Sequence, residues 1–136
     1  MFILIVTKEV QNEIEALKKT NFDAAIAALL LLEALADDQD ELEYLCTPGN
    51  RFQYTPGFEV KNFVLAQKQG FNINILKFCD EDGAQPRHRI LVGFHAQRNT
   101  YYALAVTHRN VSYDQNSDEY RILRDRYNDY GIPLYR

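Results

Sequence analysis

The sequence has few of the features that define disulfide-rich, metal-binding and membrane proteins. Its 136 residues include two cysteines, Cys46 and Cys79, and no second Cys or His lies at ligand spacing from either. This pattern argues against a disulfide framework and a zinc pair, and it favours a reduced, cytoplasmic setting. The longest apolar run, residues 24–32, is far shorter than the ~20 residues that cross a bilayer. We expect no membrane partner and no signal peptide, because Lys8 and Glu9 directly follow the apolar start.

Several catalytic motifs are also missing. No glycine-rich phosphate loop is present, since Gly49, Gly57 and Gly70 are isolated turn residues, and no Gly-x-Ser-x-Gly elbow occurs. The paired carboxylates at 37–38 and 80–82 lie in polar turns, where solvent keeps both ionised and unsuited to proton transfer. Nucleotide hydrolysis and acyl transfer are therefore disfavoured, and we expect neither a cofactor nor a metal.

Charge is divided unevenly along the chain. Residues 1–85 carry seven basic and fourteen acidic residues, a net charge of −7, whereas residues 86–136 carry eight arginines and five acidic residues, a net charge of +3. All three histidines also lie in the second part. We therefore expect the C-terminal half to meet any anionic partner. Arginine suits this task, because its planar guanidinium binds phosphate with two bonds and stacks on bases.

The N-terminal half has the pattern of one strand followed by helices, within a single domain of residues 1–136. Residues 2–6 are all apolar, which is typical of a strand covered on both faces. Thr7 can cap a short helix that ends near Lys19, and Thr20 or Asn21 can start a second one rich in alanine and leucine. The acidic run 37–43 then closes or extends this helical hairpin.

The second half alternates with the period of strands. Residues 58–65, 71–76, 89–94 and 101–106 have strand character, and short polar turns join the last of these into a meander. Ser117 opens a final helix that presents Tyr120, Leu123, Tyr127 and Tyr130 on one side and ends at Gly131. We predict an α+β fold with an N-terminal strand, a two-helix hairpin, an antiparallel sheet of about four strands and a C-terminal helix.

Arg, His and Tyr residues gather on the last two predicted strands and the segment after them. If these strands are antiparallel, the loop at 97–100 sets the register so that His108 and Arg109 lie near Arg87 and Arg89. Two guanidiniums, an imidazole and the Tyr113 hydroxyl would then share one end of the sheet. Cleavage of an RNA phosphodiester by its own 2′-hydroxyl needs such a set, because cations neutralise the phosphate and a proton donor assists the leaving oxygen.

The order of these segments resembles the RelE/ParE toxin superfamily. The junction at residues 2–17, in which a strand runs through Thr7-Lys8-Glu9 into a helix, is similar to the start of these toxins, and residues 71–77, 89–94 and 102–109 resemble their later strands. The resemblance covers nearly the whole chain. It implies a RelE-like toxin of a type II toxin–antitoxin pair, an endoribonuclease that cleaves messenger RNA in association with the ribosome and is held inactive by a cognate antitoxin.

The resemblance also implies roles for individual residues. Arg89 and Arg109 match the phosphate-contacting basic residues of the family, and His108 or Tyr113 would act as the general acid. We therefore expect a catalytic set of Arg89, His108, Arg109 and Tyr113, and an RNA-binding set of Lys77, Arg87, His95 and Arg98.

Two other interpretations stay open at this stage. The chain could be a non-catalytic binding module of the same fold, either a gyrase-directed toxin or a protein that only pairs with an antitoxin peptide across apolar positions such as Leu29 and Leu32. It could also be an α+β domain with an unrelated small ligand. The segment 42–54 is long for this family, and its sequence assigns it no role.

Overall fold

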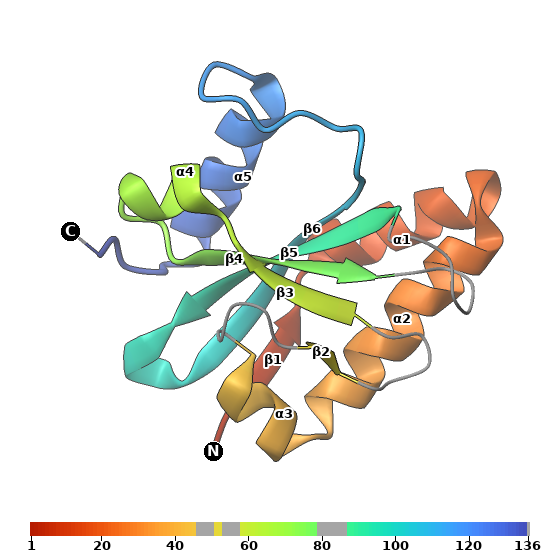
Figure 1. Cartoon of the computed structure of the whole chain (residues 1–136), viewed down its shortest axis with the longest axis horizontal. Helices are drawn as coiled ribbons and strands as arrows, with labels where there is room; N and C mark the ends of the chain where they lie inside the picture. The colour runs from red at the N-terminus through yellow and green to blue at the C-terminus, as the bar shows by residue number, and fades with distance from the viewer. Residues whose placement is uncertain (46–50, 53–57, 79–86, 136) are drawn as a thin grey trace.

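The computed structural model describes residues 1–45, 51–52, 58–78 and 87–135 (Figure 1). Cys46, Cys79 and the turns predicted at 47–50, 55–57 and 80–83 lie outside these residues. The elements follow the predicted order in large part. They are β1 (Ile3–Val6), α1 (Lys8–Thr20), α2 (Phe22–Ala36), α3 (Gln39–Tyr44), β2 (Arg51–Phe52), β3 (Phe58–Asn62), α4 (Val64–Lys68), β4 (Ile73–Phe78), β5 (His88–His95), a 3-10 turn (Ala96–Arg98), β6 (Thr100–His108) and α5 (Asp118–Asp129).

The described strands form one mixed sheet in the order β1-β6-β5-β4-β3-β2. The α+β class is confirmed, but the sheet has six strands, and β1 lies parallel to β6 while all other pairs are antiparallel. The predicted antiparallel strands correspond to β3, β4, β5 and β6, and the structure adds β1 at one edge and the two-residue strand β2 at the other. Sequence patterns do not report the strand order, and the parallel pair joins the first and last strands of the chain.

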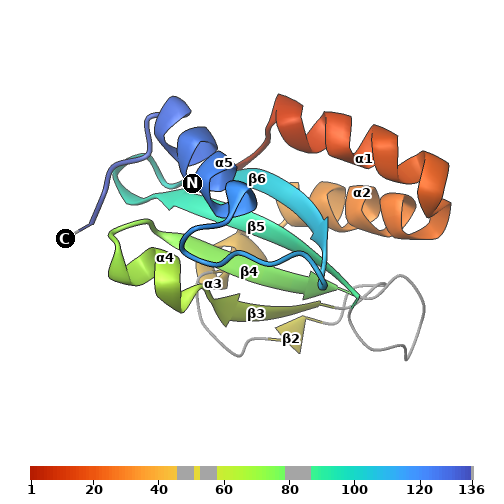
Figure 2. The same cartoon turned by 90° about the horizontal axis from the view of Figure 1, so that it is seen from above.

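Helices cover both faces of the sheet (Figure 2). One core lies between the sheet and α1, α2 and α3, where Leu31 and Leu35 belong to the same cluster as Ile90 and Tyr101. A second core lies on the other face beneath α4 and α5, built around Phe71, Leu104, Tyr120, Leu123 and Tyr127. The predicted inward side of α5 is thereby confirmed, and β4, β5 and β6 are buried on both faces.

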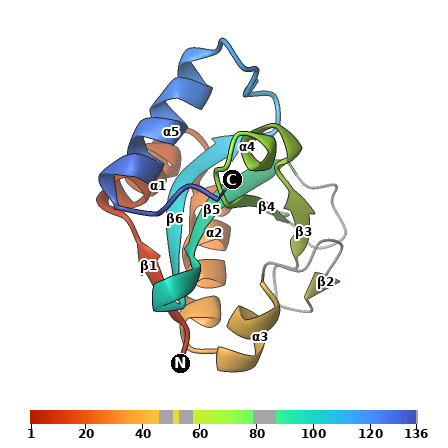
Figure 3. The ribbon, with the colours of Figure 1, turned by 90° about the vertical axis from the view of Figure 1, so that its left-hand side faces the viewer.

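The first strand differs from its prediction. It lies at the edge of the sheet, and its side chains alternate between the two faces: Leu4 and Val6 pack against the α1–α2 core, whereas Ile3 is 49% and Ile5 is 38% exposed. An all-apolar strand is therefore covered on one face only. The reason is the position of α5, which packs over β6 and leaves the outermost strand uncovered on that face (Figure 3).

The helix starts agree with the capping signals of the sequence. The Thr7 hydroxyl accepts a hydrogen bond from the Val10 amide at 3.3 Å, the Asn21 side chain accepts one from Ala24 at 3.1 Å, and the Ser117 hydroxyl accepts one from Tyr120 at 3.1 Å. Each cap satisfies a backbone donor that the first helical turn leaves free. The strand predicted to continue to residue 65 was wrong, because β3 ends at Asn62 and the short helix α4 follows.

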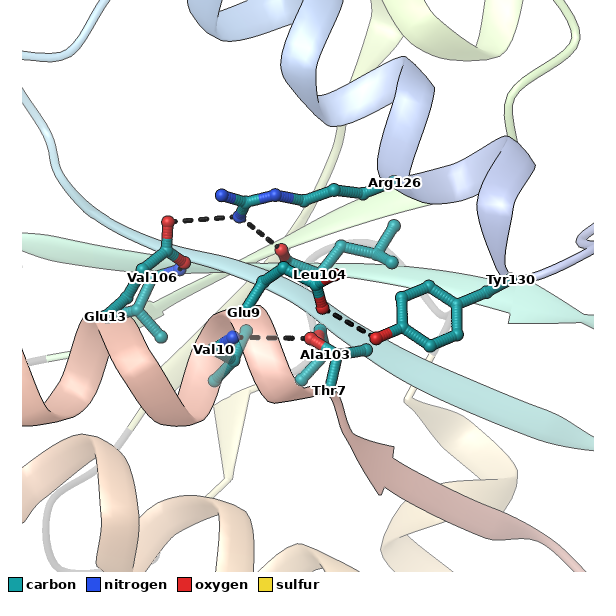
Figure 4. Close-up of polar contacts among 9 residues, drawn as sticks. All are labelled: Thr7, Glu9, Val10, Glu13, Ala103, Leu104, Val106, Arg126 and Tyr130. Carbon is teal, nitrogen blue, oxygen red and sulfur yellow. Dashed lines mark hydrogen bonds and ion pairs between the residues drawn. The ribbon is translucent and has the colours of Figure 1, made fainter.

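The pairing of β1 with β6 ends at Val6 and Ala103, where the chain enters α1. Beyond this point, side chains from α1 and α5 form hydrogen bonds with the backbone of β6 (Figure 4). Glu13 accepts a hydrogen bond from the Val106 amide at 3.0 Å, and Arg126 donates to the Leu104 carbonyl at 2.8 Å. Arg126 and Glu13 also form an ion pair at 3.0 Å. This network ties both helices to β6, the strand that pairs with β5.

Candidate functional site

An open groove with a volume of about 870 Å³ lies on the α4–α5 face of the sheet. Strands β3, β4 and β5 supply its polar residues, and the segment that begins α4 supplies apolar ones. It lies at the end of the sheet where β5 begins and β6 ends. Its lining consists of Glu59, Lys61, Asn62, Phe63, Val64, Leu65, Ile75, Lys77, His88, Arg89 and Arg109.

A row of polar residues crosses four strands at this end of the sheet, and its members on β3, β4 and β5 line the groove. In the register of the sheet, Glu59 lies opposite Lys77, Lys77 opposite Arg89, and Arg89 opposite Thr107. Residues directly opposite each other in neighbouring strands share one face, so three charged side chains lie side by side. Lys61 lies two residues after Glu59 on β3, opposite Ile75, and adds another cation to the groove.

The predicted register of β5 and β6 is confirmed. His88 lies opposite His108, and the Arg109 amide donates to the Arg87 carbonyl at 2.8 Å. The Arg89 guanidinium donates from Nη2 to the backbone carbonyl of Arg109. Arg89 therefore holds the end of β6 in place, and it brings Arg109 to the same groove.

Lys77 has an altered acidity. Burial lowers the pKa of its ammonium group, and the neighbouring Lys61 lowers the pKa further. Arg89 acts in the same direction, and only Glu59 opposes these effects. A lysine with a lowered pKa is better suited to give and take protons near neutral pH than a solvated one.

Tyr113 lies behind the apolar side of the groove. Its ring packs edge-on against Phe63, with 5.9 Å between ring centroids. Burial raises the pKa of the Tyr113 hydroxyl to about 12, and a hydrogen bond with Thr107 and the charges of Arg126 and Arg89 oppose that rise. At neutral pH this hydroxyl keeps its proton.

Of the predicted catalytic set, Arg89 and Arg109 line the groove and Tyr113 lies behind it, but His108 does not join them. Its ring contacts His88 edge-on, with 5.1 Å between centroids, and its Nδ1 accepts a hydrogen bond from the Asn110 amide at 3.1 Å. His108 lines a smaller cavity beside α1 with Glu13 and Leu17. Alternation along β6 explains this result, because Thr107 lies opposite Arg89 on the same face of the sheet and the next residue points to the other face.

The predicted RNA-binding set is divided as well. Lys77 lies in the groove, and Arg87 is exposed at its end, immediately before β5. His95 and Arg98 lie at the opposite end of β5, six residues from Arg89, which corresponds to about 20 Å of strand. His95 is also buried, at 5% exposure. These two residues are therefore not part of the same surface.

Two charged residues of the groove, Glu59 and Lys61, were not predicted. Their strand was recognised, and their spacing of two places both on one face of it. The missing information was the pairing of β3 with β4, which brings Glu59 opposite Lys77.

Among the described residues, no group of three or more His, Cys, Asp or Glu could hold a metal ion. No described helix is long and apolar enough to cross a membrane. No family model, curated protein or solved structure matches this chain.

Proposed function

We propose that this chain is a RelE-like toxin of a type II toxin–antitoxin pair and that its groove binds and cleaves messenger RNA. The observation that carries the proposal is the position of Lys77 directly opposite Arg89 inside the groove. Like charges directly opposite each other destabilise a sheet, and Glu59, opposite Lys77 on the other side, is one carboxylate among the four cations of the lining. A phosphodiester backbone would compensate the remaining cations, since it carries one negative charge per nucleotide.

The charge balance of the molecule supports an anion site at this place. The whole chain has a formal net charge of −4, but the groove lining contains Lys61, Lys77, Arg89 and Arg109 against one carboxylate, Glu59. A concave, positively charged patch on an otherwise acidic protein attracts a polyanion locally. Arginine adds planar, paired hydrogen bonds to phosphate oxygens.

The residues allow a complete reaction. Glu59 accepts the proton of the 2′-hydroxyl, the 2′-oxygen attacks phosphorus, and the bond from phosphorus to the 5′-oxygen breaks. Lys77 gives its proton to that leaving oxygen, while Arg89 and Arg109 stabilise the charge on the phosphorane-like intermediate. The products are a 2′,3′-cyclic phosphate and a free 5′-hydroxyl. Tyr113 is the alternative proton donor, and His108 has no place in this scheme because it faces the other side of the sheet.

The enzyme test is expression in growing cells. Induction of the wild-type chain should arrest translation, and Arg89→Ala and Arg109→Ala should each remove the arrest. Arg121→Ala is a matched control, because Arg121 is exposed on α5, pairs with Asp118 and lies outside the groove lining. Arrest that persists unchanged in both groove variants would contradict the assigned roles. Comparison of naked RNA with a translating extract then tests whether the ribosome is needed.

A second candidate is a binding module that only pairs with an antitoxin. The observation in its favour is an apolar stripe on α2, in which Phe22 is 60% and Leu30 is 49% exposed and Ile26 lies between them at helical spacing. A partner helix of a cognate antitoxin would cover such a stripe. Leu29 and Leu32 were candidate contact positions if exposed; Leu29 is partly exposed, whereas Leu32 is 1% exposed and belongs to the core. Translation arrest without RNA cleavage, or no arrest at all, would favour this candidate.

A further inference from the structure

We propose that Val64 and Leu65, at the start of α4, form a binding site for an unpaired nucleobase, so that the substrate class is single-stranded RNA. This inference rests on the proposed function, because it assigns a role to the second half of the same groove. The cations rise from the strands, whereas the apolar lining comes from the segment that begins α4. A nucleotide offers the matching pair of surfaces, an anionic phosphate and an apolar base face.

The exposure of Val64 is the first observation behind this proposal. Val64 is 56% exposed, although it lines a concave surface beside Lys77 and Arg89. A single exposed apolar residue on a convex surface needs no explanation. Inside a groove that also gathers charge, apolar surface next to a few polar groups is the usual composition of a ligand site.

The wall is also held rigidly before any ligand binds. Phe63 is 8% exposed and packs against Tyr113 and against Tyr120, with 5.7 Å between the Phe63 and Tyr120 centroids. The Gln67 side chain donates to the Ile73 carbonyl at 3.1 Å, which fixes α4 to β4. A preordered surface loses little conformational entropy when a base packs on it.

A paired base cannot use this wall. In a duplex the base faces are covered by neighbouring base pairs, so a helix could reach the cations only through its phosphates. An unpaired base can leave the stack and pack on the apolar wall while its phosphate contacts Arg89. The groove therefore discriminates between single-stranded and double-stranded RNA.

Binding of three labelled oligonucleotides to the full-length chain tests this inference. The probes are a short 2′-O-methyl adenosine strand, which resists cleavage by 2′-hydroxyl attack, an abasic strand with the same number of phosphates, and the duplex of the first strand. The wild-type chain should bind the base-bearing single strand most tightly. Val64→Ser should weaken that binding about fivefold and leave binding of the abasic strand unchanged.

Ile122→Ser is the matched control, because Ile122 is 42% exposed on α5 and does not line the groove. It should change neither affinity. Equal wild-type affinity for the base-bearing and abasic strands, equal affinity for the duplex, or an equal loss on both single strands in Val64→Ser would overturn the base site while leaving the anion groove intact. Absence of binding to all three probes, both by the isolated chain and in a translating extract, would instead overturn the proposed function and this inference with it.

Discussion

Lys77 and Arg89 lie directly opposite each other on β4 and β5, and both line the basic groove. Their strands lie in the interior of the sheet, with a paired strand on each side, so the two residues cannot separate by local detachment of an edge strand. The fold holds two cations together at a cost in stability. The pKa of Lys77 is lowered by its burial first, then by Lys61, and Arg89 adds to that lowering. This cost is typical of residues kept for binding or catalysis.

Lys77→Met should raise the free energy of unfolding at neutral pH by about 0.5 kcal/mol, because it removes one of two opposed cations. The pKa of Lys77 is lower in the folded chain than in the unfolded one, so between these two values the unfolded chain binds more protons. The free energy of unfolding of the wild type should therefore rise relative to that of the variant as pH rises towards about 10. Urea unfolding at neutral and alkaline pH measures this difference, and a difference that is constant with pH would refute the prediction.

His108→Gln should leave RNA cleavage close to the wild-type rate, because this imidazole lies in a different cavity from Arg89 and Arg109. Lys77→Met should instead lower the rate about a hundredfold, because it removes the proton donor of the proposed reaction. Cleavage rates of messenger RNA in a translating extract provide the comparison, with thermal unfolding as the control for folding. The reverse order of effects would restore His108 as the general acid.

Arg126→Met should lower the free energy of unfolding by about 2 kcal/mol. The substitution keeps much of the packing of the side-chain stem but leaves the Leu104 carbonyl and the Glu13 carboxylate without their guanidinium partner. Arg121→Met is the control, because the Arg121–Asp118 pair is exposed at 3.6 Å and contributes little. Denaturant unfolding of the two variants should separate them clearly, and equal stability losses would argue against the network.

Glu9→Gln should be less stable than the wild type at neutral pH. The Tyr130 hydroxyl donates to Glu9 Oε2 at 2.6 Å, and this hydrogen bond lowers the pKa of the Glu9 carboxyl. A lowered carboxyl pKa stabilises the fold above the unfolded value of about 4.3 and ceases to do so as pH falls through the folded value. The two proteins should therefore converge in stability in acid. Tyr130→Phe should give the same pH dependence, and divergence of either variant from the wild type at low pH would contradict the assignment.

Local signals predicted the helical part of this fold well. Thr7, Asn21 and Ser117 cap the three longest helices as expected, because a cap needs only a side-chain oxygen and an amide three residues later. The register of β5 on β6 was also predictable, since a short turn leaves little freedom in how the two strands pair.

The site was only partly predictable. Period-two alternation already separates Thr107 from His108, but it does not say which face carries the groove. The strand at 58–65 was extended too far, and the helix α4 that replaces its end supplies the apolar wall of the groove. Glu59 and Lys61 are part of the site because β3 pairs with β4. These two strands are separated in the sequence by the segment that contains α4.

The amino-acid sequence alone determined the starts of α1, α2 and α5, the antiparallel β5–β6 pair and the concentration of arginine in the second half. Each of these depends on hydrogen bonds or alternation among residues close together in the chain. Only the tertiary structure decided that β1 is an edge strand, that His108 faces away from Arg89, and that Lys77 meets Arg89 in a groove. Those outcomes depend on which distant strands pair and which face each helix buries, and that choice follows from apolar burial summed over the whole chain.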